Sequence, residues 1–148
     1  MSQRPHRTAR LTALDTNVLA RYYVQADGAD AATTQQCERA RALIESGKPL
    51  FVATTVALEL EWVLRGFYKL PPDTVAAVFH HLLAMPHVQL QDRQALQNAC
   101  DALGQGFDFA DALHHASGRH CDAMATFDDK GFVQRAAAKG WVPKVLVP

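Results

Sequence analysis

The sequence is poor in the residues on which several common enzyme classes depend. Its cysteines, Cys37, Cys100 and Cys121, are scattered and form no C-x-x-C pair, so neither a disulfide framework nor a zinc knuckle is indicated. None of the serines lies in a G-x-S-x-G motif, which leaves a serine hydrolase without support. A Walker A loop and a dinucleotide-binding glycine fingerprint are also missing.

No charge of one sign dominates the chain, and no long apolar run is present. The 15 lysines and arginines balance 15 aspartates and glutamates, so any binding of a polyanion must be local. No apolar stretch approaches the ~18 residues that a membrane span needs, and none follows the early arginines as in a secretion signal. We therefore expect a cytoplasmic protein with no membrane contact, in which residues 1–10 form a flexible basic segment.

The chain has enough apolar residues for one folded domain, which we expect over residues 11–148. It has 148 residues, of which 49% are hydrophobic and 20% are charged. Alternating patterns predict strands at 11–14, 50–53, 87–90, 122–126 and 144–147, separated by helices. Strands separated by helices indicate parallel βαβ units, so the predicted fold is α/β, a three-layer α/β/α sandwich with a small parallel sheet.

Two acidic residues directly follow predicted strands. Asp15 comes after the first strand and Asp128 after the fourth. In an open parallel sheet, ligands bind at the carboxyl ends of the strands, which makes these positions candidates for a site. Each aspartate also fits a plain helix N-cap, which is the commoner role for a single aspartate at such a turn.

Two glutamates belong to the helix expected from residue 54 to 68. Glu59 lies beside the predicted apolar stripe of this helix, where a carboxylate needs a cation partner. Glu61 comes one turn before Arg65 and is explained by a solvated ion pair. Glu59 is equally compatible with a half-exposed surface acid. The stripe consists of Val56, Leu60, Val63, Leu64 and Phe67.

Asp108 and Asp111 lie three residues apart at the start of a predicted helix. As a helix start, Asp108 is the N-cap and Asp111 is favoured by the helix dipole. Phe107, Phe109 and Leu113 around them belong to the core, so Asp111 is expected to be partly desolvated.

The segments around Asp15, Glu59, Asp111 and Asp128 converge at one rim of the sheet if the crossovers follow the usual topology. Clustered carboxylates raise one another's pKa or bind a hard cation, and an oxygen-only set suits Mg²⁺ or Mn²⁺. A metal held by carboxylates and water is the usual apparatus of phosphate-ester chemistry.

Four motifs in order resemble the PIN-domain family, and most closely the VapC-like toxin ribonucleases of bacterial toxin–antitoxin pairs. They are LDTNVL at 14–19, LELEWVLR at 58–65, DFADAL at 108–113 and TFD at 126–128. The resemblance implies a Mg²⁺- or Mn²⁺-dependent endoribonuclease that cuts single-stranded RNA. It further implies a homodimer that is neutralised by a small antitoxin protein.

Carried over by position, the resemblance gives catalytic and metal-binding roles to Asp15, Glu59, Asp111 and Asp128. Supporting roles fall to Thr16 and Asn17 in the turn after the first acid, and to Asp108 and Asp129 beside matched positions. Because Asp128 and Asp129 are adjacent, the identity of the fourth ligand stays open.

Two other functions remain alternatives. In a catalytically silent PIN-like module, the acids only anchor the basic segment of a partner. A haloacid-dehalogenase-like phosphatase is less favoured, because it would have an aspartate where Asn17 stands.

Two further surface features bear on partners. RNA needs cations at the rim of an acidic site. Leu58 and Trp62 form an outward apolar pair that fits a partner subunit, an antitoxin helix or simple packing under a neighbouring helix. The candidate rim cations are Arg21, Arg65, Lys69, Lys130 and Arg135.

Overall fold

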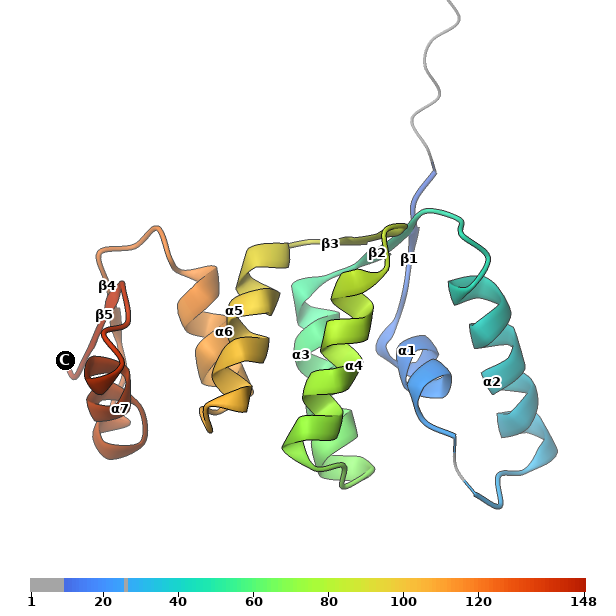
Figure 1. The fold of residues 1–148 in the computed structure, drawn as a ribbon, viewed down its shortest axis with the longest axis horizontal. Coiled ribbons are helices and arrows are strands. Elements are labelled where there is room, and N and C mark those ends of the chain that lie inside the picture. The colour runs from blue at the N-terminus through green and yellow to red at the C-terminus, as the bar shows by residue number, and fades with distance from the viewer. Residues whose placement is uncertain (1–9, 26) are drawn as a thin grey trace, which may run out of the picture.

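The computed structural model describes residues 10–25 and 27–148, and short strands alternate with helices throughout this part (Figure 1). Nearly all of the predicted basic segment 1–10 therefore lies outside the described residues. The elements in chain order are β1 (Thr12–Ala13), α1 (Thr16–Tyr23), α2 (Ala31–Ile44), β2 (Leu50–Val52), α3 (Thr54–Trp62), η1 (Val63–Phe67), α4 (Pro72–Ala84), β3 (Val88–Leu90), α5 (Arg93–Gly104), α6 (Phe109–Ser117), β4 (Ala123–Ala125), η2 (Asp129–Val133), α7 (Gln134–Ala138) and β5 (Lys144–Leu146).

Local sequence signals account for where these helices begin. Asp30 and Asp92 cap α2 and α5, with their side-chain oxygens accepting hydrogen bonds from the backbone three residues later. Pro72 stands in the first turn of α4, where a missing N–H costs nothing. The π-helical turns η1 and η2 continue α3 and precede α7. None of the helices in the described ranges is long and apolar enough to cross a membrane.

All strand pairs are parallel, which confirms the α/β prediction, but the strands form two sheets where the sequence predicted one. The first sheet has the order β1-β2-β3, and the second consists of β4 and β5. After α6 the chain runs to the side of the α5–α6 pair that faces away from β1–β3 (Figure 1). The second sheet therefore does not extend the first one.

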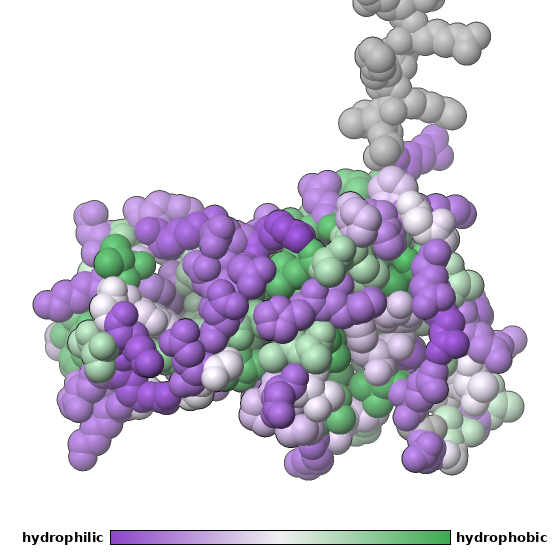
Figure 2. Space-filling view, viewed as in Figure 1, coloured by the Kyte–Doolittle hydropathy of each residue, from purple (hydrophilic) through white to green (hydrophobic). Residues whose placement is uncertain are grey.

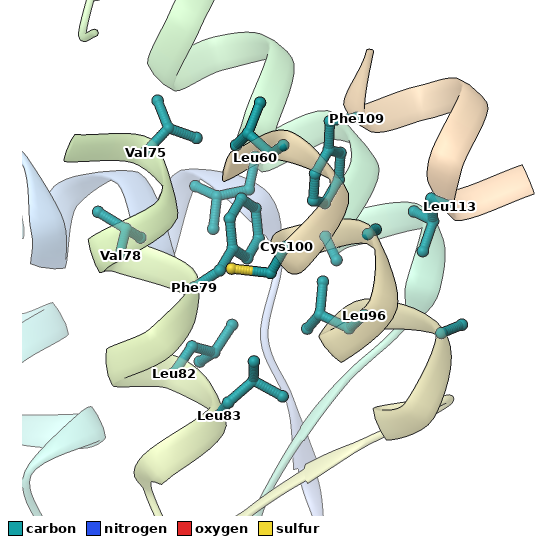
Figure 3. Close-up of a cluster of buried hydrophobic side chains, with 14 of the residues drawn as sticks. Leu60, Val75, Val78, Phe79, Leu82, Leu83, Leu96, Cys100, Phe109 and Leu113 are labelled. Atoms are coloured by element: carbon teal, nitrogen blue, oxygen red, sulfur yellow. The ribbon is translucent and has the colours of Figure 1, made fainter. Parts of the chain in front are cut away.

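A cluster of buried side chains between α3, α4, α5 and α6 forms the core (Figure 3). Phe79 from α4 stacks on Phe109 from α6, with 4.9 Å between ring centroids. Leu60 from α3 and Leu113 from α6 are also buried here. Hydrophilic residues cover most of the face in Figure 2. Packing of α6 side chains in this core fixes the start of α6, where two of the predicted site residues lie.

Aromatic contacts attach the C-terminal sheet to α6. The ring of Trp141 stacks on Phe107 at 4.2 Å between centroids and lies 4.8 Å from His115. The buried His115 donates a hydrogen bond from Nε2 to the carbonyl oxygen of Pro143, at 2.7 Å. These contacts hold β4 and β5 in place relative to α6.

The Phe79 ring tests this description of the core. Phe79→Ala empties a fully buried site, so we expect the free energy of unfolding to fall by about 3–5 kcal/mol. Phe67→Ala is the matched control, because Phe67 is 71% exposed and its loss should cost under about 1 kcal/mol. Urea denaturation measures both values, and equal losses would contradict the assignment.

Candidate acidic site

Asp15 lies where β1 passes into α1, as the sequence predicted. Its Oδ1 accepts a hydrogen bond from the backbone N–H of Thr16 at 2.7 Å, which helps to begin the helix. Leu14 and Thr16 are buried on either side, whereas Asp15 and Asn17 are exposed. The carboxylate is therefore presented to solvent at the carboxyl end of the strand.

Asp108 and Asp111 have different environments at the start of α6. Asp108 is exposed and is the N-cap, with its Oδ1 accepting a hydrogen bond from the N–H of Asp111 at 3.0 Å. The Asp111 side chain is half-buried. Burial raises the pKa of the Asp111 carboxyl, and the nearby charges of Asp108 and Asp128 raise it further. These three carboxylates, called the Asp111 group below, are thus within electrostatic reach of one another.

The turn after β4 distinguishes Asp128 from Asp129. Asp128 Oδ1 accepts a hydrogen bond from the N–H of Gly131 at 2.9 Å. A Cβ at position 131 would lie only 2.6 Å from that oxygen, so a larger residue there would displace the Asp128 carboxylate from this hydrogen bond. Asp129 instead accepts a hydrogen bond from the Gln134 amide at 3.2 Å. Of Asp128 and Asp129, only Asp128 contributes to the raised pKa of Asp111, which favours Asp128 as the acid of this group.

The burial predicted for the two glutamates of α3 is wrong, because their places are exchanged. Glu59 is exposed, and Glu61 is buried with only 3% of its surface accessible. The buried face of the helix runs through Ala57, Leu60, Glu61 and Leu64, whereas Phe67 is exposed. The predicted stripe left out the small Ala57, which places the true stripe over Glu61.

Arg65 joins the buried Glu61 to the surface. Its Nε donates a hydrogen bond to Glu61 Oε1 at 2.8 Å, and half of the Arg65 side chain remains exposed. The hydrogen bond to Glu61 raises the pKa of the Arg65 guanidinium, and the negative charge of Asp108 adds to this effect. The spacing of Ala57, Leu60 and Leu64 is the sequence signal that would have identified Glu61.

The structure therefore brings together part of the predicted acid set. Asp108, Asp111 and Asp128 are neighbours, whereas Asp15 and Glu59 are not among the charges that raise the pKa of Asp111. Across the same ranges, no three His, Cys, Asp or Glu side chains are close enough to hold a metal ion together. Magnesium commonly uses one or two carboxylates, with water and substrate phosphate completing its shell. The oxygen-only Asp111 group fits such a hard cation in its chemistry.

A pocket lined by two arginines includes Asn17, which is two residues after Asp15 in the sequence. It has a volume of about 390 Å³, and Asn17, Arg21 and Arg39 are among the residues that line it. Arg21 is held in place, because it donates hydrogen bonds to the Gln36 side chain at 3.0 Å and to the Tyr68 hydroxyl at 3.1 Å. Two guanidinium groups beside a polar amide are suited to binding a phosphate.

The remaining cations predicted at the rim have varied surroundings. The Arg135 guanidinium lies over the Phe107 ring, 4.7 Å from the ring centroid, which gives this cation a role in packing. Lys69 and Lys130 are exposed. Of the predicted outward pair, only Trp62 is exposed, at 60%, whereas Leu58 is half-buried against the core.

Comparisons of the chain with protein-family models, curated proteins and solved structures find no match. The likeness to the PIN family therefore rests on the four motifs and on the residues described above.

The two glutamates of α3 give a paired test of the site. Glu61→Ala removes a buried hydrogen-bond acceptor and the partner of Arg65, so we expect the free energy of unfolding to fall by about 1–2 kcal/mol. Glu59→Ala removes an exposed side chain and should change it by under about 0.5 kcal/mol. Chemical denaturation compares the two, and a larger loss at position 59 would contradict the burial pattern.

The raised pKa of Asp111 predicts that removing this carboxylate stabilises the fold, by an amount that depends on pH. The folded protein holds the Asp111 proton more tightly than the unfolded chain, so the ionised carboxylate destabilises the fold above its pKa. Asp111→Asn should therefore raise the melting temperature at pH 7. The gain in the free energy of unfolding should be only roughly a few tenths of a kcal/mol, because solvent screens the repulsion. The gain should shrink as the pH falls through the raised pKa and vanish below the unfolded value of 3.8.

Thermal unfolding at a series of pH values measures this effect. Asp129→Asn is the control, because this exposed neighbour does not contribute to the raised pKa of Asp111. A variant at position 111 that is less stable than the parent at pH 7 would show that the carboxylate stabilises the fold.

Proposed function

We propose that the protein is a Mg²⁺- or Mn²⁺-dependent endoribonuclease of the PIN type, the toxin of a toxin–antitoxin pair, that acts in the cytoplasm. The observation that carries this proposal is the half-buried Asp111, whose pKa is raised by burial and by two neighbouring carboxylates. Repulsion that is kept at the start of a motif-bearing helix supports a cation site at these carboxylates. The proposal includes a PIN-like three-layer α/β/α sandwich, to which the parallel strands β1–β3 and β4–β5 belong.

The chain's acids would hold the cation, and its turns position those acids. Asp15, Glu59, Asp111 and Asp128 are the proposed ligands, with Asp108 holding the start of α6. The backbone N–H of Thr16 binds the Asp15 carboxylate, and Asp129 supports the turn after β4. Thr16 and Asn17 would support the turn after Asp15. A divalent cation supplies an activated water and stabilises negative charge on the leaving oxygen of a phosphodiester. No side-chain nucleophile is required.

RNA must be held beside carboxylates that repel its phosphates. The pocket with Arg21 and Arg39 offers a positive surface in which Arg21 is held in place, and this supports binding of the RNA backbone there. The exposed Trp62 and Phe67 lie on the helix that also carries Glu59. We assign this apolar surface to the antitoxin, since burying it offers a partner helix a large apolar gain.

A catalytically silent PIN-like module is the second candidate. The observation in its favour is that Asp15 and Glu59 are not joined to the Asp111 group in the described part of the chain. In this function, the acids would bind a basic segment of a partner protein and cut nothing. A haloacid-dehalogenase-like phosphatase has no such support, because Asn17 stands where its second aspartate belongs.

Cleavage of single-stranded RNA separates these functions. With Mg²⁺ or Mn²⁺ the purified protein should cut unstructured RNA, EDTA should stop the reaction, and Asp111→Asn should slow it by about 100-fold or more. Asp73→Asn, at an exposed acid in α4, should leave the rate unchanged. Unchanged cleavage by the Asp111 variant would overturn the assignment, and no cleavage by the parent would favour the binding module.

A further inference from the structure

The pocket between α1 and α2 is lined mainly by side chains that donate hydrogen bonds. Its volume of about 390 Å³ lies in the range of small-molecule sites, roughly 300–1,000 Å³. Figure 1 shows α1 and α2 beside each other, at the end of the molecule away from β4 and β5. The described residues that line the pocket include no acid and are Asn17, Val18, Arg21, Gln36, Arg39 and Ala40. Such a lining is suited to an anion.

The hydrogen bond between Arg21 and Gln36 fixes which way the Gln36 amide faces. Arg21 Nε donates to Gln36 Oε1 at 3.0 Å. A guanidinium group has donors only, so the amide oxygen must be the atom that faces it. The amide nitrogen of Gln36, with its two N–H groups, is thereby turned away from Arg21. The acceptor of this side chain is engaged within the protein, and its donors remain available for a ligand.

Arg21 is also fixed by a second hydrogen bond. Its Nη1 donates to the Tyr68 hydroxyl at 3.1 Å, and Tyr68 directly follows the π-helical turn η1. Because these bonds engage Nε and Nη1, the Nη2 group is the part of Arg21 that can donate to a ligand. Arg39, exposed on α2, adds a second guanidinium group to the pocket.

One carboxylate, that of Asp30, is within electrostatic reach of Arg21. A hydrogen bond from the backbone of Thr33 lowers the pKa of the Asp30 carboxyl, and the charge of Arg21 lowers it further. Asp30 Oδ1 accepts that hydrogen bond at 2.7 Å and caps α2. Since Asp30 is engaged at the start of the helix and carries one negative charge, it does not neutralise both guanidinium groups of the pocket.

The two guanidinium groups favour a dianion. A phosphomonoester carries a charge of about −1.5 to −2 at pH 7, whereas a phosphodiester within a nucleic acid strand carries a single negative charge. Guanidinium groups match the geometry of phosphate oxygens and form strong, charge-assisted hydrogen bonds with them. A terminal phosphate therefore gains more in this pocket than an internal one.

An apolar wall beside the donors indicates that the ligand is larger than a phosphate ion. Val18 is half-buried and Ala40 is buried, and both line the pocket. Inorganic phosphate has no apolar surface to place against them, whereas the carbon face of a ribose has. Donors on one side and apolar atoms on the other thus fit the phosphate and sugar of a nucleotide.

We propose that this pocket is a binding site for the phosphomonoester group of a nucleotide, which Arg21, Arg39 and the Gln36 amide would hold. Such a group occurs at the 5′ end of an RNA strand and on a free mononucleotide, and both present the same dianion next to a ribose. Binding needs neither a metal ion nor the acids of the candidate site. The inference therefore goes beyond the proposed ribonuclease function and is tested separately from it.

Calorimetric titration in EDTA measures this binding without cleavage. The ligands are a short RNA with a 5′-phosphate, the same RNA with a 5′-hydroxyl, adenosine 5′-monophosphate and adenosine. In at least one of these pairs, the phosphorylated ligand should bind about 10-fold or more tightly than its partner. A difference in only one pair identifies the source of the phosphate, either the strand end or the free nucleotide. Equal affinities within both pairs would overturn the proposal.

Three variants test whether the phosphate is bound in this pocket. In Gln36→Glu, a carboxylate oxygen can still accept the Arg21 hydrogen bond, but the free amide donors become a negative oxygen that repels phosphate, so the preference for the phosphorylated ligand should be lost. Arg39→Gln should weaken binding of that ligand about 10-fold. Arg41→Gln removes the same charge from an exposed position of α2 outside the pocket lining and should have little effect.

Thermal unfolding checks that each of these variants is folded, which is expected because all three positions are exposed. A full preference for the phosphorylated ligand in both Gln36→Glu and Arg39→Gln would overturn the proposal. Equal weakening by Arg39→Gln and Arg41→Gln would also overturn it, because the effect would then come from the general charge of α2. Binding with the expected losses in a protein that cuts no RNA would refute the ribonuclease function and support this site.

Discussion

Repulsion between carboxylates at the start of α6 is the constraint on which the account depends. Asp108 and Asp128 lie near the half-buried Asp111, and their charges raise its pKa. The core tolerates this cost because Phe109, in the same turn, stacks on Phe79 and fixes the helix independently of the acids (Figure 3). Packing therefore contributes to the stability of this segment and offsets the repulsion between its acids.

Local sequence signals predicted the elements and the caps, but not how distant segments meet. The alternation of strands and helices, the turn at Asp15 and the cap at Asp108 follow from residues within a few positions. Burial of Glu61 was missed because the predicted stripe left out the small Ala57, which faces the core, and because a buried glutamate is unexpected unless Arg65 holds its charge. Pairing between strands far apart in sequence leaves no local pattern, which is why the division into two sheets was not predicted.

The division of the sheet and the division of the acids have one geometric origin. Asp15 is placed by β1, whereas Asp128 is placed by the turn after β4, and these strands belong to different sheets. The separation of the two groups of carboxylates therefore follows from the separation of the two sheets.

The most direct measurement of the central claim is the anomalous scattering of a crystal soaked in Mn²⁺. The account predicts one strong peak in contact with the carboxylates of Asp111 and Asp128, with a carboxylate of Asp15 on its other side. A map without a peak at these side chains, in which the carboxylates are solvated separately and far apart, would contradict it.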